Sequence, residues 1–304
     1  MKHLFIVNPA AGGGKSAQKL KKLVEAVFAP GEWEVLYTEK AGDARDFARR
    51  AAQSGEDVRI YACGGDGTLN EVVNGAAGWP NAAVTHVPIG TGNDFLRIFG
   101  KKARQLFRDL AALKNGPQTA FDLMDCNGLL GLDVVCAGVD ARVAAQVHRY
   151  KRLPLVGGKL AYILSLLNTL GKGITRPMEI SMGPIHYAGP TAILCICNGR
   201  YYGGGFCPVP EAMPDDGVLD MILIGDLPLL TFARYVGKYA AGKYRQCPPE
   251  LVQNWKGTAV TFAFTRPALA IVDGETVEGL EFVVKLSEKK VNFFYPAAAD
   301  YRPR

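Results

Sequence analysis

A carboxylate set between glycines is the first feature of the sequence that points to chemistry. Residues 64–68 read Gly-Gly-Asp-Gly-Thr and follow an apolar run that ends at Cys63. Glycines let the backbone approach an anion closely, whereas a carboxylate at the centre of such a loop repels a phosphate unless a divalent cation lies between them. Asp66 therefore predicts Mg²⁺ bound together with a nucleotide. The structural alternative is an Asx turn between glycines.

Two more glycine-rich loops follow apolar runs in the first part of the chain. One spans residues 11–14, just after Asn8, and the other spans residues 90–94, which read Gly-Thr-Gly-Asn-Asp. Loops that follow the strands of a parallel sheet emerge at one edge, where ligands of such folds bind. Residues 12–16 resemble a Walker A loop only superficially, because the first glycine of that motif is absent. Three such loops predict one phosphate-binding edge.

Acidic residues form two further candidate sites in the second half of the chain. Asp273 and Glu275 follow the apolar run 268–272, so both should lie at the end of a strand, although a surface turn with ordinary acids is the plainer interpretation. Residues 213–218 read Met-Pro-Asp-Asp-Gly-Val. The Asp216 carboxylate and the carbonyls of Met213 and Val218 could hold Mg²⁺ or Ca²⁺. A loop capped by its own aspartates is an equally good interpretation.

The elements that must position these residues change in character near residue 118. Before it, short apolar runs alternate with amphipathic segments, which predicts a three-layer α/β domain with a mostly parallel sheet. After it, strand-like runs dominate, with one helical interlude from Asp140 to about residue 170, which predicts an antiparallel β sandwich or barrel. The expected fold class is therefore α/β, with an N-terminal domain at 1–118 and a β-sandwich-like domain at 119–287.

Composition and charge limit the classes of protein to consider. The chain has 304 residues, of which 48% are hydrophobic and 21% charged, so disorder is excluded. Its seven cysteines are scattered, which is typical of reduced thiols in a cytoplasmic protein. No apolar run approaches the roughly 20 residues of a spanning helix. Residues 141–178 contain seven basic residues and no acid, which indicates a solvated face or an anionic partner.

Taken in order, the motifs resemble the diacylglycerol kinase catalytic domain, a family of bacterial lipid kinases that also includes sphingosine and ceramide kinases. The likeness covers nearly the whole chain. The Gly-Gly-Asp-Gly-Thr loop is shared with NAD kinases and loosely with phosphofructokinases, whereas Gly-Thr-Gly-Asn-Asp-Phe points to the lipid branch. The matching segments are Asn8-Pro9 and residues 64–72, 88–95, 121–123, 138–141, 198–205, 214–217 and 273–275.

The resemblance implies an NAD kinase-like nucleotide-binding domain at 1–118 and a β-rich lipid-substrate domain at 119–287. The tail, 288–304, would return to the first domain, with an extra strand within 290–295. It also implies ATP and Mg²⁺ as cofactors. Met213, Asp216 and Val218 would form a structural metal site, as in related bacterial lipid kinases.

Roles for single residues follow from the same resemblance. Asp273 would be the general base that takes the proton of the lipid hydroxyl, and Glu275 would bind Mg²⁺ or orient Asp273. Asn8 and Thr38 would lie nearer the nucleoside. Asp94 and Asp122 would join a Mg²⁺–water network, and Lys15 and Lys159 would add charge near the phosphates or be ordinary surface lysines. The residues expected to hold the phosphates and their metal are Gly64, Gly65, Asp66, Gly67, Thr68, Thr91, Gly92, Asn93 and Asp94.

The resulting hypothesis is an ATP-dependent lipid kinase that converts diacylglycerol to phosphatidic acid, with a sphingoid base or phosphatidylglycerol as alternative acceptors. NAD kinase is disfavoured because its Thr-Gly-Ser-Thr-Ala-Tyr segment is absent, and a non-catalytic regulator because the carboxylates are retained. Nucleic acid is not expected as a partner, since the basic stretch lacks aromatic residues other than Tyr150 and Tyr162. We expect a cytoplasmic protein that contacts the membrane peripherally through basic residues flanking 160–167, and a homodimer would suit the family.

Overall fold

The computed structural model describes residues 1–13, 15–90, 92–151, 165, 168–169, 171 and 173–303. The chain forms two compact units. Unit 1 contains Met1–Leu123, Pro214–Asp216 and Ser287–Arg304, and unit 2 contains Met124–Met213 and Gly217–Leu286. The first unit extends past residue 118 because strand β5 (Gln118–Phe121) pairs with β16 (Val291–Phe294) of the returning tail.

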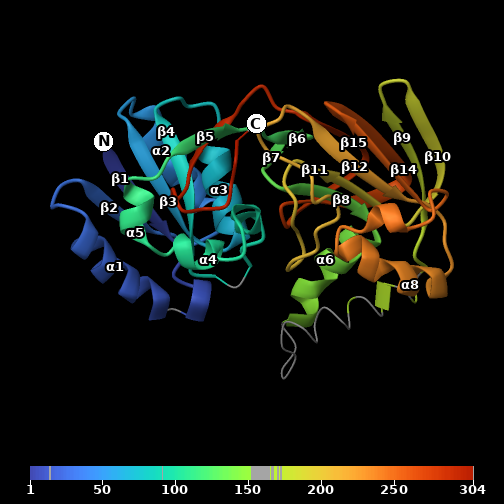
Figure 1. Ribbon diagram of the computed structural model, residues 1–304, viewed down its shortest axis with the longest axis horizontal. Helices are drawn as coiled ribbons and strands as arrows, with labels where there is room; N and C mark the ends of the chain where they lie inside the picture. The colour runs from blue at the N-terminus through green and yellow to red at the C-terminus, as the bar shows by residue number, and fades with distance from the viewer. Residues whose placement is uncertain are drawn as a thin grey trace. The chain divides into compact units, whose positions relative to one another are not determined.

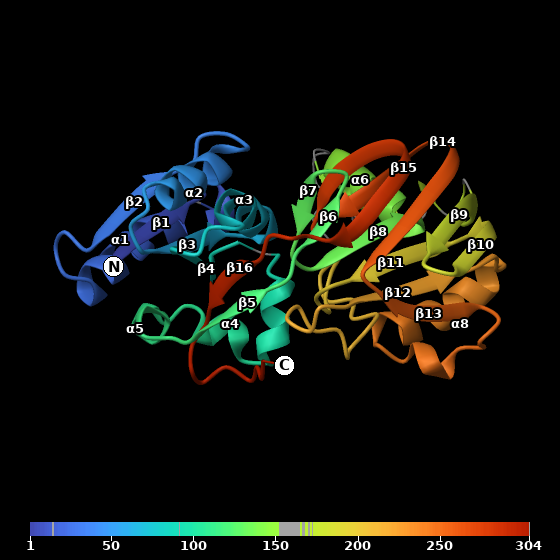
Figure 2. The ribbon, with the colours of Figure 1, turned by 90° about the horizontal axis from the view of Figure 1, so that it is seen from above.

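Unit 1 is built on a six-stranded sheet in the order β2-β1-β3-β4-β16-β5. Its first four strands run parallel, and β16 joins β4 in parallel and β5 antiparallel (Figure 2). The mostly parallel sheet and the strand in the tail are as predicted. The bounds are β1 Lys2–Val7, β2 Trp33–Tyr37, β3 Val58–Gly64 and β4 Ala82–Pro88.

Helices cover both faces of this sheet. Helices α2 (Asp43–Gln53) and α3 (Asp66–Ala76) lie on one face, and α1 (Lys15–Val27) and α5 (Leu110–Lys114) lie on the other (Figure 2). Helices α2 and α3 pack so closely that a Cβ at Gly75 would lie 2.3 Å from the Arg45 carbonyl oxygen. The remaining helical elements of unit 1 are α4 (Ala103–Leu106) and the 3-10 helices Ala11–Gly13 and Phe95–Phe99.

An aromatic cluster fixes the returning tail in unit 1. The Phe293 ring of β16 stacks on Phe121 and on Phe99, with ring centroids 5.3 and 5.7 Å apart. All three rings are buried. Burial of each such ring contributes on the order of 2 kcal/mol, so the tail is an integral part of the first core.

Unit 2 is an antiparallel, sandwich-like β unit, as predicted. Its main strands run in the order β13-β12-β11-β8-β14-β15-β6-β7, and the β9–β10 hairpin joins through β14 (Figure 1). The apolar run 268–272 is the end of a longer strand, β14, whose register shifts between Ala263 and Ala268. The bounds are β6 Met124–Cys126, β7 Leu129–Gly131, β8 Val134–Gly138, β9 Arg176–Met182, β10 Ile185–Thr191, β11 Ile193–Cys197, β12 Leu219–Ile224, β13 Val252–Gly257, β14 Ala259–Val272 and β15 Glu275–Leu286.

Both faces of the central strands of unit 2 are buried, which explains their continuous apolar runs. In β11, Cys195 packs into one hydrophobic cluster and Leu194 into the other. Helices α6 (Val139–Lys151) and α8 (Leu229–Ala240) contribute to the first cluster. Helix α6 confirms only the start of the expected helical interlude, because most of residues 152–172 lie outside the described part of the chain.

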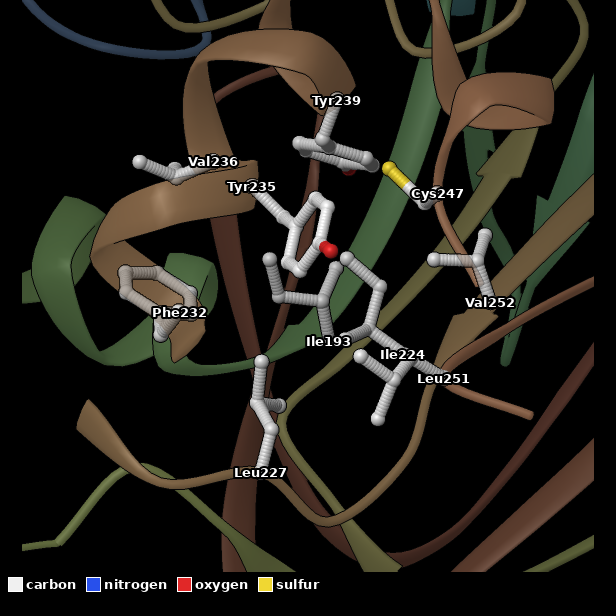
Figure 3. A pocket seen from close by; sticks show the side chains of 10 residues that line it. All are labelled: Ile193, Ile224, Leu227, Phe232, Tyr235, Val236, Tyr239, Cys247, Leu251 and Val252. Atoms are coloured by element: carbon white, nitrogen blue, oxygen red, sulfur yellow. The ribbon is translucent and has the colours of Figure 1, made fainter. Parts of the chain in front are cut away.

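Helix α8, which the sequence analysis did not predict, packs tightly against the sheet. Figure 3 shows Phe232, Tyr235 and Tyr239 of this helix pointing toward Ile193 and Ile224. The void they enclose is only about 10 Å³, so this contact is core packing and not a ligand site. Within the residues that the structure describes, no helix has the length and apolar character needed to span a bilayer.

Candidate active site

The carboxyl ends of the parallel strands bring the predicted nucleotide-binding residues of unit 1 to one edge. Asn8 follows β1 and its N–H donates to the Cys63 carbonyl of β3, at 3.0 Å. Thr38 follows β2 and its N–H donates to the Val7 carbonyl of β1, also at 3.0 Å. The Asn8 side chain also contacts helix α3, because its Nδ2 donates to Thr68 Oγ1 at 3.4 Å. The geometry therefore joins Asn8, Thr38 and Thr68 at a single rim.

The second and third glycine loops contact each other backbone to backbone. The Gly90 N–H donates to the Gly64 carbonyl at 2.9 Å, and a Cβ at Gly90 would lie 2.9 Å from Gly65 Cα. A Cβ at Gly64 would lie 2.2 Å from Thr68 Oγ1. Close approach thus requires glycine at these positions. Burial lowers the pKa of His86 to about 4, so its neutral ring donates from Nε2 to the same Gly64 carbonyl.

Asp66 connects these two loops at the first turn of α3. Its Oδ1 accepts the Asp94 N–H at 2.9 Å. Its Oδ2 faces Gly92, where a Cβ would lie only 2.7 Å away. The missing side chain at Gly92 leaves room beside this oxygen, which is what a metal ligand needs. Among the described residues, no group of three or more His, Cys, Asp or Glu could hold a metal, so a cation here would also need phosphate and water oxygens.

The segment after Asp94 forms a five-residue 3-10 helix, Phe95–Phe99. Asp94 Oδ1 accepts from Arg97 Nε at 3.1 Å. This short element lacks the aligned dipole of a long helix, whereas α3 has eleven residues and begins at Asp66. Of these two elements, only α3 therefore has the length and dipole that favour an anion at its N-terminus.

Two other predicted residues, Asn93 and Asp122, make contacts within unit 1. Asn93 Nδ2 donates to the Gly90 carbonyl at 3.2 Å and so braces the third loop. Asp122 is buried and forms an ion pair with Lys290 Nζ of the tail at 2.8 Å, which gives it a structural contact. Thr91, Lys159 and the side chain of Lys15 lie outside the described part of the chain.

Unit 2 holds Asp273 in a tightly fixed turn between β14 and β15. Asp273 has φ 49° and Gly274 has φ 96°, the pair of left-handed conformations that an Asp-Gly hairpin turn adopts. The Asp273 carboxylate accepts three backbone N–H groups, those of Leu132, Asp133 and Val134, at 2.5–3.0 Å. These amides both orient the carboxylate and stabilise its ionised form.

The residues that support this turn were not among those predicted from the sequence. Asn198 Nδ2 donates to the Leu132 carbonyl at 2.7 Å, and the Asn198 and Gly199 N–H groups donate to the Asp133 carbonyl. Asp133 Oδ1 accepts the Tyr201 N–H at 3.3 Å. Asp133 lies within a run that reads as one strand, so nothing in its spacing separated it from core residues. The motif at 198–205 singled out Asn198, but the sequence did not show that Asn198 holds the backbone of Leu132 and Asp133.

Glu275 and the proposed loop metal site stay predictions. Glu275 is exposed, and its side chain makes no hydrogen bond or ion pair within the described residues. The amides of residues 132–134, and not the Glu275 side chain, orient Asp273. Asp216 belongs to unit 1, whereas Met213 and Val218 belong to unit 2.

A buried carboxyl near the start of α6, that of Asp140, has a raised pKa. The Tyr202 hydroxyl donates to Asp140 Oδ2 and lies 2.8 Å from the Tyr239 hydroxyl. Burial raises the pKa of Asp140 to about 6, and the hydrogen bond from Tyr202 only partly opposes this. The folded protein therefore keeps a proton on Asp140 at pH values where an unfolded chain has lost it.

This raised pKa predicts a pH-dependent stability. The contribution of Asp140 is fully present below about pH 4 and is lost as pH rises through 6, which amounts to about 2–3 kcal/mol. Asp140→Asn keeps an acceptor for Tyr202 and carries no charge. Urea unfolding should show the variant to be more stable than the wild type at pH 8, with the difference shrinking toward pH 5. Asp46→Asn, on the exposed face of α2, should show no such trend. A difference independent of pH would contradict the assignment.

Comparisons with known proteins find relatives for both parts of the chain. The family model for the diacylglycerol kinase catalytic domain matches residues 2–126, and that for the YegS C-terminal NAD kinase beta sandwich-like domain matches residues 133–294. A relative from Pseudomonas fluorescens (strain Pf0-1), named "Probable lipid kinase YegS-like", is 31% identical over 252 residues, covering 81% of this chain and 74% of the relative. A protein of the same name from Pseudomonas aeruginosa is 35% identical, covering 64% and 63%.

Solved structures share the fold. A crystal structure of a diacylglycerol kinase from Bacillus anthracis str. Sterne superposes with a TM-score of 0.70 at 21% identity, over 98% of each chain. At this identity the likeness supports the two-unit architecture alone.

Proposed function

Because the chain belongs to the diacylglycerol kinase catalytic-domain family, we propose that it is a lipid kinase that transfers the γ-phosphoryl group of ATP to diacylglycerol. The observation that carries the proposal is the joined pair of glycine loops, with Asp66 beside the space left by Gly92. The matched catalytic-domain region contains this whole rim.

The rim suits a magnesium-bound triphosphate. Mg²⁺ binds through one or two carboxylates while the substrate phosphates and water supply its other ligands, and Asp66 offers such a carboxylate. When bound, the ion neutralises charge on the transferred phosphoryl group. The amides at the start of α3 would receive phosphate oxygens, and Gly65 and Gly67 leave the backbone open to them. Asn8 and Thr38 mark the side of the rim proposed for the nucleoside.

Asp273 is the proposed base of the reaction. Its carboxylate would take the proton of the acceptor hydroxyl as the hydroxyl oxygen bonds to the γ-phosphorus and the bond to the β-phosphate oxygen breaks, leaving ADP and a lipid phosphate. The three amides hold the carboxylate in one orientation, so little of its side-chain freedom is lost in the reaction. Its ionised form, which the amides stabilise, is the form that a base requires.

The acceptor is tested by transfer from γ-labelled ATP to lipids in mixed micelles. We expect labelled phosphatidic acid from diacylglycerol, with no transfer when Mg²⁺ is removed by EDTA. The matched arms contain phosphatidylglycerol, sphingosine or NAD⁺ at the same concentration. Preferential label on phosphatidylglycerol or sphingosine would replace diacylglycerol as the acceptor. Label on NAD⁺ alone, or on none of the acceptors, would contradict the lipid kinase assignment.

A further inference from the structure

A cleft of about 570 Å³ lies in unit 2, lined by residues of α6, β9 and β14. The first turn of α6, the start of β9 and the irregular middle of β14 form its walls. The register shift of β14 between Ala263 and Ala268 opens the sheet at this point. Its volume falls in the range of roughly 300–1,000 Å³ that is typical of small-molecule sites.

Three arginines line this cleft, and no acid is among the described residues that line it. Arg142 donates to the carbonyls of Gly173 and Ile174 at 2.8 and 2.6 Å, while its Nε is buried with no partner among the described residues. Burial, and then the nearby charge of Arg176, lower the pKa of Arg142 to about 10, so it is still positive at neutral pH. Cations that repel one another in a partly buried space favour the binding of an anion.

Apart from Thr265, the other described residues that line the cleft are apolar or glycine. Phe264, Pro177 and Leu269 face the same space as the three arginines. Beside an apolar wall, a small inorganic anion would lose hydrating water and gain no hydrogen bond in its place. An amphiphile, in contrast, would bury its carbon chain against the same wall. Guanidinium groups bind phosphate through paired hydrogen bonds. A phosphate ester with hydrocarbon attached therefore fits the lining better than free phosphate.

The cleft is also distinct from the turn that holds the proposed base. Leu269 of β14 lies four residues before Asp273, which follows the end of the strand, and this is a separation of about 13 Å at about 3.3 Å per residue. Arg266 lies further from the turn along the same strand. A phosphate held by the arginines is therefore not positioned for the acceptor hydroxyl at Asp273.

We propose that this cleft binds the phosphate of an anionic membrane phospholipid through Arg142, Arg176 and Arg266, with the adjoining carbons against Phe264, Pro177 and Leu269. Arg142 and Arg176 come from the acid-free stretch 141–178, and the fold adds Arg266 from a distant part of the sequence. The site would attach unit 2 to an anionic bilayer without being the acceptor site. It does not depend on the proposed catalytic activity.

Calorimetry with dihexanoyl phosphatidylglycerol below its micelle concentration tests the proposal, because no bilayer surface charge is then present. Arg266 is exposed, so Arg266→Gln should fold normally and weaken binding by about five-fold or more. Arg142→Lys, which keeps the charge but loses the guanidinium fork, should also weaken it. Arg234→Gln removes one positive charge from the exposed face of α8, and this variant should change binding less than about two-fold.

Further arms of the experiment separate the possible ligands. Inorganic phosphate at equal concentration should not displace the lipid, and dihexanoyl phosphatidylcholine should bind more weakly than the anionic lipid. Equal displacement by inorganic phosphate would overturn the lipid as ligand. Unchanged binding by Arg266→Gln, or an equal loss in Arg234→Gln, would overturn the cleft as the site. ATP is omitted throughout and Asp273→Asn should bind normally, so failure of the kinase proposal would not affect the result.

Discussion

Asp273→Asn is expected to lower the rate of lipid phosphorylation by about 10²–10⁴-fold, the contribution of a positioned general base. The expected loss is in kcat, with little change in the KM for ATP, because the base acts on the acceptor hydroxyl. Steady-state kinetics with ATP and lipid varied separately would measure both kcat and the KM for ATP.

The same substitution also has a structural effect that must be separated from catalysis. The Asp273 carboxylate accepts the N–H groups of Leu132, Asp133 and Val134, and an asparagine would place its NH₂ against at least one of these donors. One unsatisfied pair of this kind costs about 1–3 kcal/mol of folding stability. Urea unfolding should therefore show a loss of that size, with the variant still folded in the assay.

Glu275→Gln is the matched control, since it removes a carboxylate two residues away that is exposed and forms no hydrogen bond within the described residues. We expect less than a tenfold change in kcat if Glu275 only contributes to the local charge, and a larger loss if it binds the catalytic Mg²⁺. A folded Asp273→Asn protein with normal kcat would show that Asp273 only fixes the loop at 132–134.

Local sequence signals were sufficient to predict the glycine rim and the sheet beneath it. The loop at 64–68 can be interpreted from its own residues, because a Cβ at Gly64 would lie 2.2 Å from Thr68 Oγ1 and Asp66 is the one charge among the glycines. Strand-loop-helix order then fixes the edge at which such loops meet. The returning strand β16 has no such local signal. It could be predicted only from the family resemblance, because its partners β4 and β5 are far away in the sequence.

Contacts between distant segments account for what could not be predicted. The turn at Asp273 depends on amides that lie about 140 residues earlier, and those amides are held in turn by Asn198. The arginine cleft combines two basic residues of one stretch with Arg266 and an irregularity in β14. Helix α8 was missed because its apolar residues face a sheet whose strands dominate the surrounding pattern. Periodicity describes one segment at a time and cannot report such combinations.

Asp66→Asn is expected to reduce kcat/KM for Mg-ATP by about 10²–10³-fold, the size of effect seen when one electrostatic contact to the transferred group is removed. The asparagine oxygen can still accept the Asp94 N–H, so the junction of the two loops should persist and the variant should fold. What is lost is the charge beside Gly92. The Mg²⁺ concentration needed for half-maximal activity should therefore rise, while the KM for the lipid changes little.

The Mg²⁺ titration decides between a metal-binding and a purely structural Asp66. A structural Asx turn tolerates asparagine, so it would leave both the titration midpoint and kcat/KM close to the wild-type values. Gly92→Ala supplies an independent check, because its Cβ would lie 2.7 Å from Asp66 Oδ2 and would fill the space proposed for the cation while leaving the charge in place. If both variants shift the Mg²⁺ dependence and Asp46→Asn does not, then charge and space at the rim are both required. That pairing is what distinguishes a magnesium-bound triphosphate site from a glycine turn that contains an acid.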